Sequence, residues 1–89
     1  MKALYCVDYF KNSILGLVEV YLYCEDAVIN MNKQLNLGEF DYANLTQVVP
    51  ETGILGYFIG RYEAIGDPYE EGVRTGEIMA EIHNKKAQE

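Results

Sequence analysis

The sequence holds very few of the residues from which metal sites and catalytic centres are usually built. It has one histidine, His83, two cysteines, Cys6 and Cys24, and no tryptophan. A zinc site needs three or four such ligands, and neither cysteine belongs to a C-x-x-C pair. The stretch from Gly53 to Gly60 lacks the lysine and the helix start of a phosphate-binding loop. We therefore expect no metal, no cofactor and no catalytic residue.

Basic residues are scarce as well. Seven lysines and arginines stand against 14 aspartates and glutamates, which gives a formal net charge of -7. A protein that binds the phosphates of nucleic acid or of anionic lipid needs a basic patch, and the basic residues here are scattered. We expect no direct contact with nucleic acid or with a membrane. A protein partner with a basic surface fits this charge, because opposite charges speed association. The alternative is that the charge only keeps a small protein dissolved.

Long apolar runs are also absent. None approaches the ~20 residues that cross a membrane, and Asp8 interrupts the first apolar stretch too early for a signal peptide. Cys6 and Cys24 lie inside apolar runs, which is typical of buried thiols in a reducing compartment, so we expect a cytoplasmic protein. A chain of 89 residues suffices for one core. We expect one compact domain over residues 1–84 and a flexible tail over residues 85–89.

Four strands and two helices are expected from the spacing of apolar residues and from the β-branched and aromatic content. The strands span residues 3–10, 15–24, 45–49 and 54–65, and the helices span about 25–36 and 68–84. Asp67, Pro68 and Glu70 mark the clearest helix start, with a cap, a proline at the first position and a glutamate at the third. The order ββαββα predicts an α+β fold with a small antiparallel sheet of about four strands. Both helices should cover one face and leave the other in water.

Period-two alternation divides the second strand into two faces. We expect Val18, Val20, Leu22 and Cys24 in the core, and Leu17, Glu19, Tyr21 and Tyr23 in water. The chain has eight tyrosines, too many for so small a domain to bury with a partner for every hydroxyl. Tyr21 and Tyr23 are therefore candidates for a partner-binding surface, where tyrosine is enriched. Ordinary cross-strand pairing on a half-exposed sheet is the alternative.

The second helix has one stripe of small and apolar residues, which we expect to face inward. This stripe holds Tyr69, Gly72, Val73, Gly76, Met79, Ala80 and His83, and Glu70, Arg74, Glu77 and Glu81 lie opposite. A glycine inside a helix costs about 1 kcal/mol relative to alanine. Gly72, Gly76 and Ala80 therefore predict a close backbone approach, either inside the domain or across an oligomer contact.

Two pairs of residues are candidates for chemistry. Asp8 and Glu19 lie on strands that should pair, and two neighbouring carboxylates can perform acid–base catalysis. The strand register decides whether they meet, because a slip of one residue reverses every face. Cys6 and His83 would need direct contact for nucleophilic catalysis, and nothing in their spacing predicts it.

These features favour a protein that acts by occupying the surface of another protein. Our first hypothesis is a non-enzymatic protein that inhibits or regulates a partner with a basic, nucleic-acid-binding surface, such as a phage counter-defence inhibitor, by analogy of size and composition. The expected partner-binding residues are Glu19, Tyr21, Tyr23, Glu70, Glu77 and Glu81. The alternative is a homo-oligomeric structural or regulatory protein, in the simplest case a homodimer, that assembles through Gly72, Gly76 and Ala80. A small enzyme is the third hypothesis.

Overall fold

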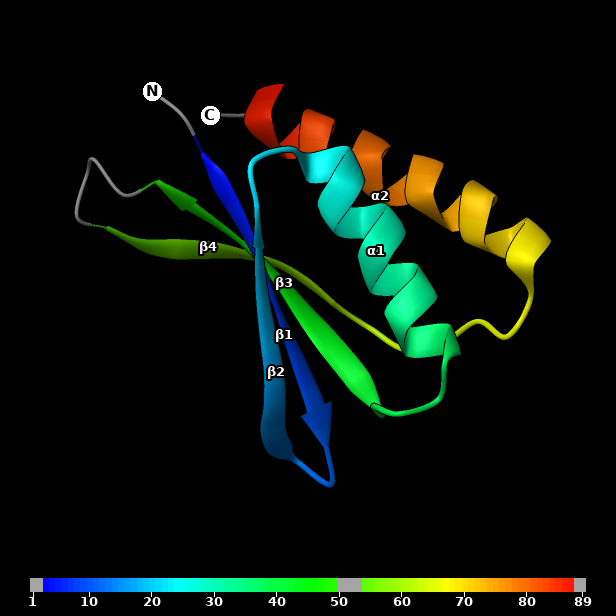
Figure 1. Ribbon diagram of the computed structural model, residues 1–89. Helices are drawn as coiled ribbons and strands as arrows, with labels where there is room; N and C mark the ends of the chain where they lie inside the picture. Colours follow the sequence, from blue (N-terminus) through cyan, green and yellow to red (C-terminus); the bar gives the residue numbers. More distant parts are fainter. Residues whose placement is uncertain (1–2, 50–53, 88–89) are drawn as a thin grey trace.

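The chain folds in the predicted order of elements. The computed structural model describes residues 3–49 and 54–87. Its elements are β1 (Leu4–Lys11), β2 (Ile14–Tyr21), α1 (Cys24–Asn36), β3 (Tyr42–Val49), β4 (Ile54–Tyr62) and α2 (Pro68–Ala87). The sheet has the order β2-β1-β3-β4, and each pair of neighbours is antiparallel. Figure 1 shows both helices on one side of the twisted sheet, which confirms the predicted α+β fold.

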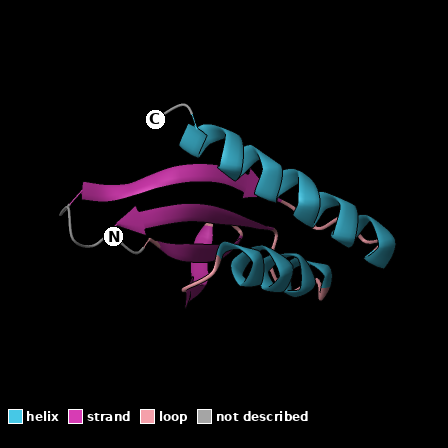
Figure 2. Cartoon of the chain, turned by 90° about the horizontal axis from the view of Figure 1, so that it is seen from above, coloured by secondary structure: helices cyan, strands magenta, loops and turns pink. Residues whose placement is uncertain are grey.

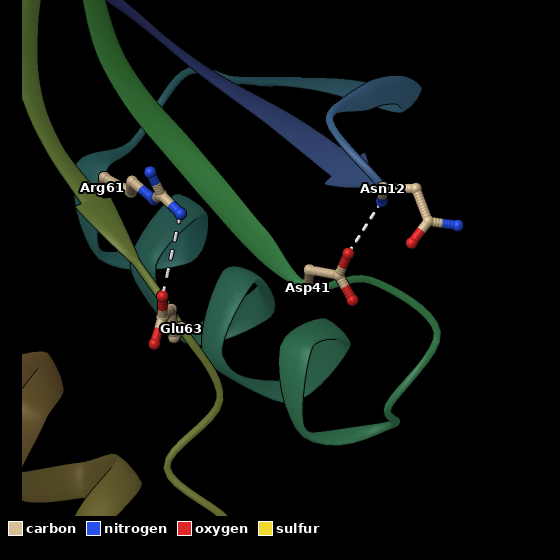
Figure 3. A network of polar contacts seen from close by, with 4 residues as sticks. All are labelled: Asn12, Asp41, Arg61 and Glu63. Atoms are coloured by element: carbon tan, nitrogen blue, oxygen red, sulfur yellow. Dashed lines mark hydrogen bonds and ion pairs between the residues drawn. The ribbon is translucent and has the colours of Figure 1, made fainter.

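A tight turn joins β1 to β2. Asn12 and Ser13 both have a positive φ, 52° and 65°. Two-residue turns of this conformation match the twist of an antiparallel hairpin. The backbone N–H of Asn12 donates to Oδ2 of Asp41 at 2.7 Å (Figure 3). This bond ties the hairpin to the loop in front of β3.

The core lies between the sheet and the helices. Along β1, Tyr5, Val7 and Tyr9 are buried, and the residues between them are half-buried. α1 covers this side of the sheet, and α2 packs mainly beside α1 (Figure 2). The other buried apolar residues are Ala27, Val28, Met31, Leu35, Ala43, Leu45, Ile59, Ile78 and Ile82. Because both helices use the same face, no described element covers the opposite face of the sheet.

The two faces of β2 are the reverse of the predicted ones. Val7 pairs with Glu19, and Asp8 pairs with Val18. Glu19 therefore shares the helix-facing side with the buried Val7, and Val18 lies on the uncovered side. The prediction was wrong because the register between β1 and β2 shifts by one residue between Tyr9 and Phe10, which exchanges the faces of an edge strand with apolar residues on both sides. Its pairing with β1, rather than its own sequence, decides which face turns inward.

The remaining residues of the predicted second strand follow from this register. Leu17 and Tyr21 lie on the side of Glu19, and Val20 lies on the side of Val18. β2 ends at Tyr21, earlier than predicted, so Leu22 and Tyr23 lie between β2 and α1, where both are exposed. Cys24 begins α1 instead of ending the strand.

The buried side of α2 also differs from the predicted one. Ile78 and Ile82 are buried, whereas Gly72, Gly76, Ala80 and His83 are exposed. A Cβ atom added at Gly72 or Gly76 would meet nothing within 4 Å. The helix is rotated in this way because the isoleucines bury much more apolar area than the glycines would. Among the described residues, close packing inside the domain therefore does not explain the two glycines.

Several boundaries differ from the expected ones. β3 begins at Tyr42 instead of residue 45, and β4 ends at Tyr62 instead of residue 65. α2 begins at Pro68 as predicted, and the backbone N–H of Glu71 donates to the carbonyl oxygen of Asp67 at 3.1 Å. The helix continues to Ala87, into the segment expected to be a tail, of which residues 88 and 89 lie outside the described residues.

The buried side of β3 provides a test of the core. Leu45 is fully buried, so Leu45→Ala should lower the free energy of unfolding by roughly 2–5 kcal/mol through lost burial and a residual cavity. Leu37 is 69% exposed at the end of α1, and Leu37→Ala should change it by less than about 0.5 kcal/mol. Urea denaturation followed by circular dichroism measures both. Equal losses in the two variants would contradict this core.

Candidate binding surfaces

The uncovered side of the sheet is the first candidate surface, and we call it the open face. By strand pairing it consists of Leu4, Cys6, Asp8 and Phe10 from β1, Leu15, Val18 and Val20 from β2, Tyr42, Asn44, Thr46 and Val48 from β3, and Phe58 and Arg61 from β4. Val18, Val20 and Phe58 are 47%, 59% and 55% exposed. An apolar area shared by four strands and left in water is typical of a protein interaction site.

Aromatic rings and one cation occupy one end of the open face. The rings of Phe10 and Tyr42 are stacked, with centroids 4.9 Å apart and planes at 12°. The guanidinium carbon of Arg61 lies 3.8 Å from the centroid of the Tyr42 ring. Arg61 also lies 3.8 Å from the carboxylate of Glu63, and both of these side chains are largely exposed (Figure 3). The ring contact holds the Arg61 charge against the sheet.

Asp8 is the acidic residue of the open face. The thiol of Cys6 points to its Oδ1 at 3.5 Å. Burial raises the pKa of the Cys6 thiol, and the nearby carboxylate of Asp8 raises it further. A protonated thiol is a weak nucleophile and a weak metal ligand. Cys6 therefore acts as a small, weakly polar packing residue on this face.

The exposed flank of α2 is the second candidate surface. Glu70, Glu77 and Glu81 follow one another at intervals of seven and four residues, so they share one side of the helix, and all three are exposed. We call this set the acidic flank. The neighbouring Arg74 donates to the backbone oxygen of Glu63 and lies over the Tyr62 ring, with its guanidinium carbon 5.1 Å from the ring centroid.

A ridge of small residues runs beside the acidic flank on the outermost side of α2. It consists of Gly72, Gly76 and Ala80, the predicted oligomer contact, and all three are exposed. The ridge is accessible to a second molecule. Its role as a contact between copies stays a prediction.

Glu19 and Tyr21 lie on the helix-facing side of the sheet rather than on a water-facing surface. Burial raises the pKa of Tyr21 to about 12, and the Glu19 carboxylate adds to this rise. Burial also raises the pKa of Tyr9, again with a contribution from Glu19. The hydroxyl of Tyr9 and Oε1 of Glu19 are buried without a hydrogen-bond partner among the described residues. Of the six expected partner-binding residues, Tyr23 and the acidic flank are therefore the accessible ones.

A polar seam joins α1 to α2. Asn32, which is buried, donates from Nδ2 to the hydroxyl of Thr75 at 3.1 Å. Asn36 donates to the carboxylate of Glu71, and its Oδ1 accepts from the backbone N–H groups of Ile65 at 3.0 Å and Gly66 at 2.9 Å. These bonds fix the loop in front of α2 and therefore the direction in which the acidic flank points.

The candidate catalytic pairs are not brought together. Asp8 and Glu19 lie on opposite faces of the sheet, because Asp8 pairs with Val18. Cys6 lies on the open face, and His83 is exposed on α2 on the other side of the sheet. Within residues 3–49 and 54–87, no group of three or more histidine, cysteine or acidic residues could hold a metal ion. No helix in the described part of the chain is long and apolar enough to cross a membrane.

The open face escaped the sequence reasoning, which expected Glu19, Tyr21 and Tyr23 on the side of the sheet that stays in water. One signal was present: the strand predicted over residues 3–10 is apolar on both faces, with Tyr5 and Val7 on one and Leu4 and Phe10 on the other. Comparison with known proteins gives no further guide, because no family model, no curated protein and no solved structure matches the chain.

The glycines of α2 give a test of the ridge. Gly76→Ala should raise the free energy of unfolding by about 1 kcal/mol, because the added methyl group meets nothing within 4 Å and alanine favours the helix. Gly16→Ala should instead lower it by about 1–3 kcal/mol, because its Cβ would lie 2.8 Å from the Phe40 ring. Thermal melts of both variants measure whether each substitution raises or lowers the stability. A loss of stability in Gly76→Ala would show that the ridge packs against another element.

The raised pKa of Tyr21 gives a test in alkaline solution. Burial favours the neutral phenol of Tyr21 in the folded state. The contribution of this phenol to the free energy of unfolding is therefore complete below its ordinary pKa of about 10, and it is lost as the pH rises through about 12. Tyr21→Phe has no phenol to ionise, so its stability should fall less than that of the parent between pH 10 and 12. Urea unfolding at a series of pH values measures the difference. Tyr23→Phe, at an exposed position outside the sheet, is the control and should follow the parent.

Proposed function

We propose that this protein acts by binding another protein that has a basic surface, and that the acidic flank of α2 makes this contact. The observation that carries the proposal is the alignment of Glu70, Glu77 and Glu81 on one exposed side of a single helix. Neither Glu70 nor Glu77 forms an ion pair with a cation among the described residues. The ion pair found in that part of the chain joins Arg61 to Glu63. Both carboxylates are exposed to a partner, and Arg74 is the cation that lies next to Glu77.

The surroundings of the acidic flank support the same function. An open depression beside it is lined by Ile65, Glu70, Val73, Arg74 and Glu77, so two apolar residues, two carboxylates and one guanidinium lie together. Val73 is half exposed and can pack against the stem of a lysine or arginine whose charge meets a carboxylate. The polar seam between the helices holds this side of α2 in a fixed position, which lowers the entropic cost of binding.

Inhibition is the more specific form of the proposal. Many basic protein surfaces bind nucleic acid, and a row of carboxylates on a rigid helix presents negative charge to the same groups. An inhibitor that covers such a surface, as a phage counter-defence factor would, needs no catalytic residue. The alternative, assembly of copies through Gly72, Gly76 and Ala80, has the accessibility of the ridge in its favour.

The proposal is tested by comparing two variants that lose the same charge at different places. In the first, Glu70→Gln, Glu77→Gln and Glu81→Gln remove the acidic flank. In the control, Glu25→Gln, Asp26→Asn and Glu39→Gln remove three exposed carboxylates elsewhere. Each protein, immobilised, is exposed to an extract of the source cell at about 50 mM and about 500 mM salt. Captured proteins are then identified and quantified by mass spectrometry.

We expect a basic protein that the parent and the control variant capture at low salt. The flank variant should capture it at least about tenfold less, and high salt should release it, because exposed charges are screened beyond a Debye length. Equal capture by the flank variant, or capture that salt does not change, would contradict the proposal. Circular dichroism checks that both variants remain folded.

A further inference from the structure

We propose that the open face is the interface of a homodimer, in which two copies pack sheet against sheet around a two-fold axis that runs parallel to the strands. The open face and the acidic flank lie on opposite layers of the molecule (Figure 1), so this inference does not depend on the proposed function.

The open face as a whole is of the size that a small dimer interface uses. Its strands have eight or nine residues. At about 3.3 Å per residue and about 4.8 Å between strands, four strands cover roughly 500 Å² in projection, and protruding side chains add to the accessible area. Specific interfaces bury about 800 Å² per partner, and weak ones bury less. The open face therefore suits a dimer with a dissociation constant on the order of micromolar.

The charge of the open face argues for a second copy rather than for the basic partner. The whole chain has a net charge of -7. The open face nevertheless carries one acidic residue, Asp8, and one basic residue, Arg61, with Glu63 at the margin. A strongly basic partner would find little to pair with there, and the opposite charges of Asp8 and Arg61 suit an identical surface turned over.

The order of residues across the strands is self-complementary. One row across the sheet reads Val18, Asp8, Asn44 and Arg61, and the next reads Val20, Cys6, Thr46 and Phe58. A two-fold axis between β1 and β3, parallel to the strands, places each row of one copy opposite the same row of the second copy, with the order of the strands reversed. Val20 then faces Phe58 of the second copy, and Cys6 faces Thr46 of the second copy. In this second row, an apolar end of one copy therefore meets an apolar end of the other.

The same axis brings the charges into favourable positions. Asp8 faces the amide of Asn44 of the second copy, and Arg61 of the second copy lies over Val18, one strand away from Asp8. The long stem of an arginine can cover a valine while its guanidinium reaches the carboxylate across the ~10 Å that separates packed sheets. An axis perpendicular to the strands would instead place β1 against β1 and bring the two Asp8 side chains toward one another. The charges therefore select the first arrangement.

Arg61 is already held for this contact. Its guanidinium lies on the Tyr42 ring, 3.8 Å from the ring centroid, so it lies along the open face while it remains exposed to water. Its pairing with Glu63 at 3.8 Å is weak, because both side chains are exposed to water. In the dimer, Arg61 pairs with Asp8 of the second copy instead of Glu63 of its own chain. This new ion pair is stronger because apolar surface around it excludes water.

The first experiment measures association of the full chain by sedimentation velocity from about 1 µM to about 500 µM, the range that a dimer with micromolar affinity requires. The parent should shift from monomer to dimer. Val20→Arg places a charge in the apolar part of the interface and should weaken association at least about tenfold. Leu37→Arg is the matched control, because Leu37 is a still more exposed apolar residue on the helix side, and association should stay as in the parent.

The second experiment exchanges the charges between copies. Asp8→Arg alone and Arg61→Asp alone each bring two pairs of like charges together across the axis, so each variant by itself should associate at least about tenfold more weakly than the parent. In a mixture, a heterodimer of the two variants has one native pair and one reversed pair, and both attract. Association of the mixture should recover to within a few-fold of the parent. A contact within one chain cannot be restored by mixing, so recovery identifies the contact as one between copies.

The inference is overturned by a parent that stays monomeric to about 500 µM, by association that Val20→Arg does not weaken, or by a mixture that fails to recover. Gly76→Leu separates this interface from the ridge on α2, and it should leave association unchanged; a loss of the dimer in Gly76→Leu alone would assign the contact to the ridge. The acidic-flank variant should dimerise like the parent. Failure of the dimer and failure of partner capture are therefore read from different variants.

Discussion

The register between β1 and β2 is the constraint on which the rest of the structure depends. β1 has apolar residues on both faces, and its pairing with Glu19 opposite Val7 puts the first buried row on the helix side. A shift of one residue would exchange the faces of β2, bring Val18 into the core and turn Glu19 to water. The turn at Asn12 and Ser13, with its two positive φ angles and its bond to Asp41, sets the pairing of Phe10 with Leu15. Between Phe10 and Tyr9 the register then shifts by one residue, and this shift puts Glu19 rather than Val18 opposite Val7.

Once that register is set, the two layers acquire different chemistry. α1 and α2 bury their aliphatic residues on one face of the sheet and carry the acidic flank on the outside. The other face keeps Val20, Phe58 and the stacked pair of Phe10 and Tyr42 in contact with water. Charge and apolar area are thus separated onto opposite sides. Two such copies joined through their open faces would present two acidic flanks on the outside, and a bivalent protein binds a repeated or extended partner more tightly than a single flank does.

Polar groups inside the molecule serve mainly to position these surfaces. Asn36 collects two backbone N–H groups of the loop before α2 and donates to Glu71, and Asn32 contacts Thr75. Bonds of this kind set the direction of α2 more firmly than apolar packing alone, which tolerates rotation of a helix. Glu19 has a different role. It lies beside Tyr9 and Tyr21 on the helix side of the sheet, where the burial of both phenols and the charge of Glu19 raise their pKa values.

The elements themselves were predictable because their signals are local. β-branched and aromatic content marks β1, and the sequence Asp67-Pro68 marks the start of α2, since a cap and a proline act on their immediate neighbours. The sides of the elements were not predictable from the same information. The stripe chosen on α2 contained Gly72 and Gly76, whereas the structure buries Ile78 and Ile82, which were passed over.

By itself, therefore, the sequence determined the order ββαββα, the acidity and the scarcity of residues suited to metals or catalysis, because these depend on composition and on near neighbours. Only the tertiary structure decided which face of β2 is hidden, that Asp8 and Glu19 lie on opposite sides of the sheet, and that an apolar face stays in water. A strand or helix with apolar residues on two sides can bury either one. The choice is made by residues far away in the sequence, through the pairing of strands and the area that each packing arrangement removes from water.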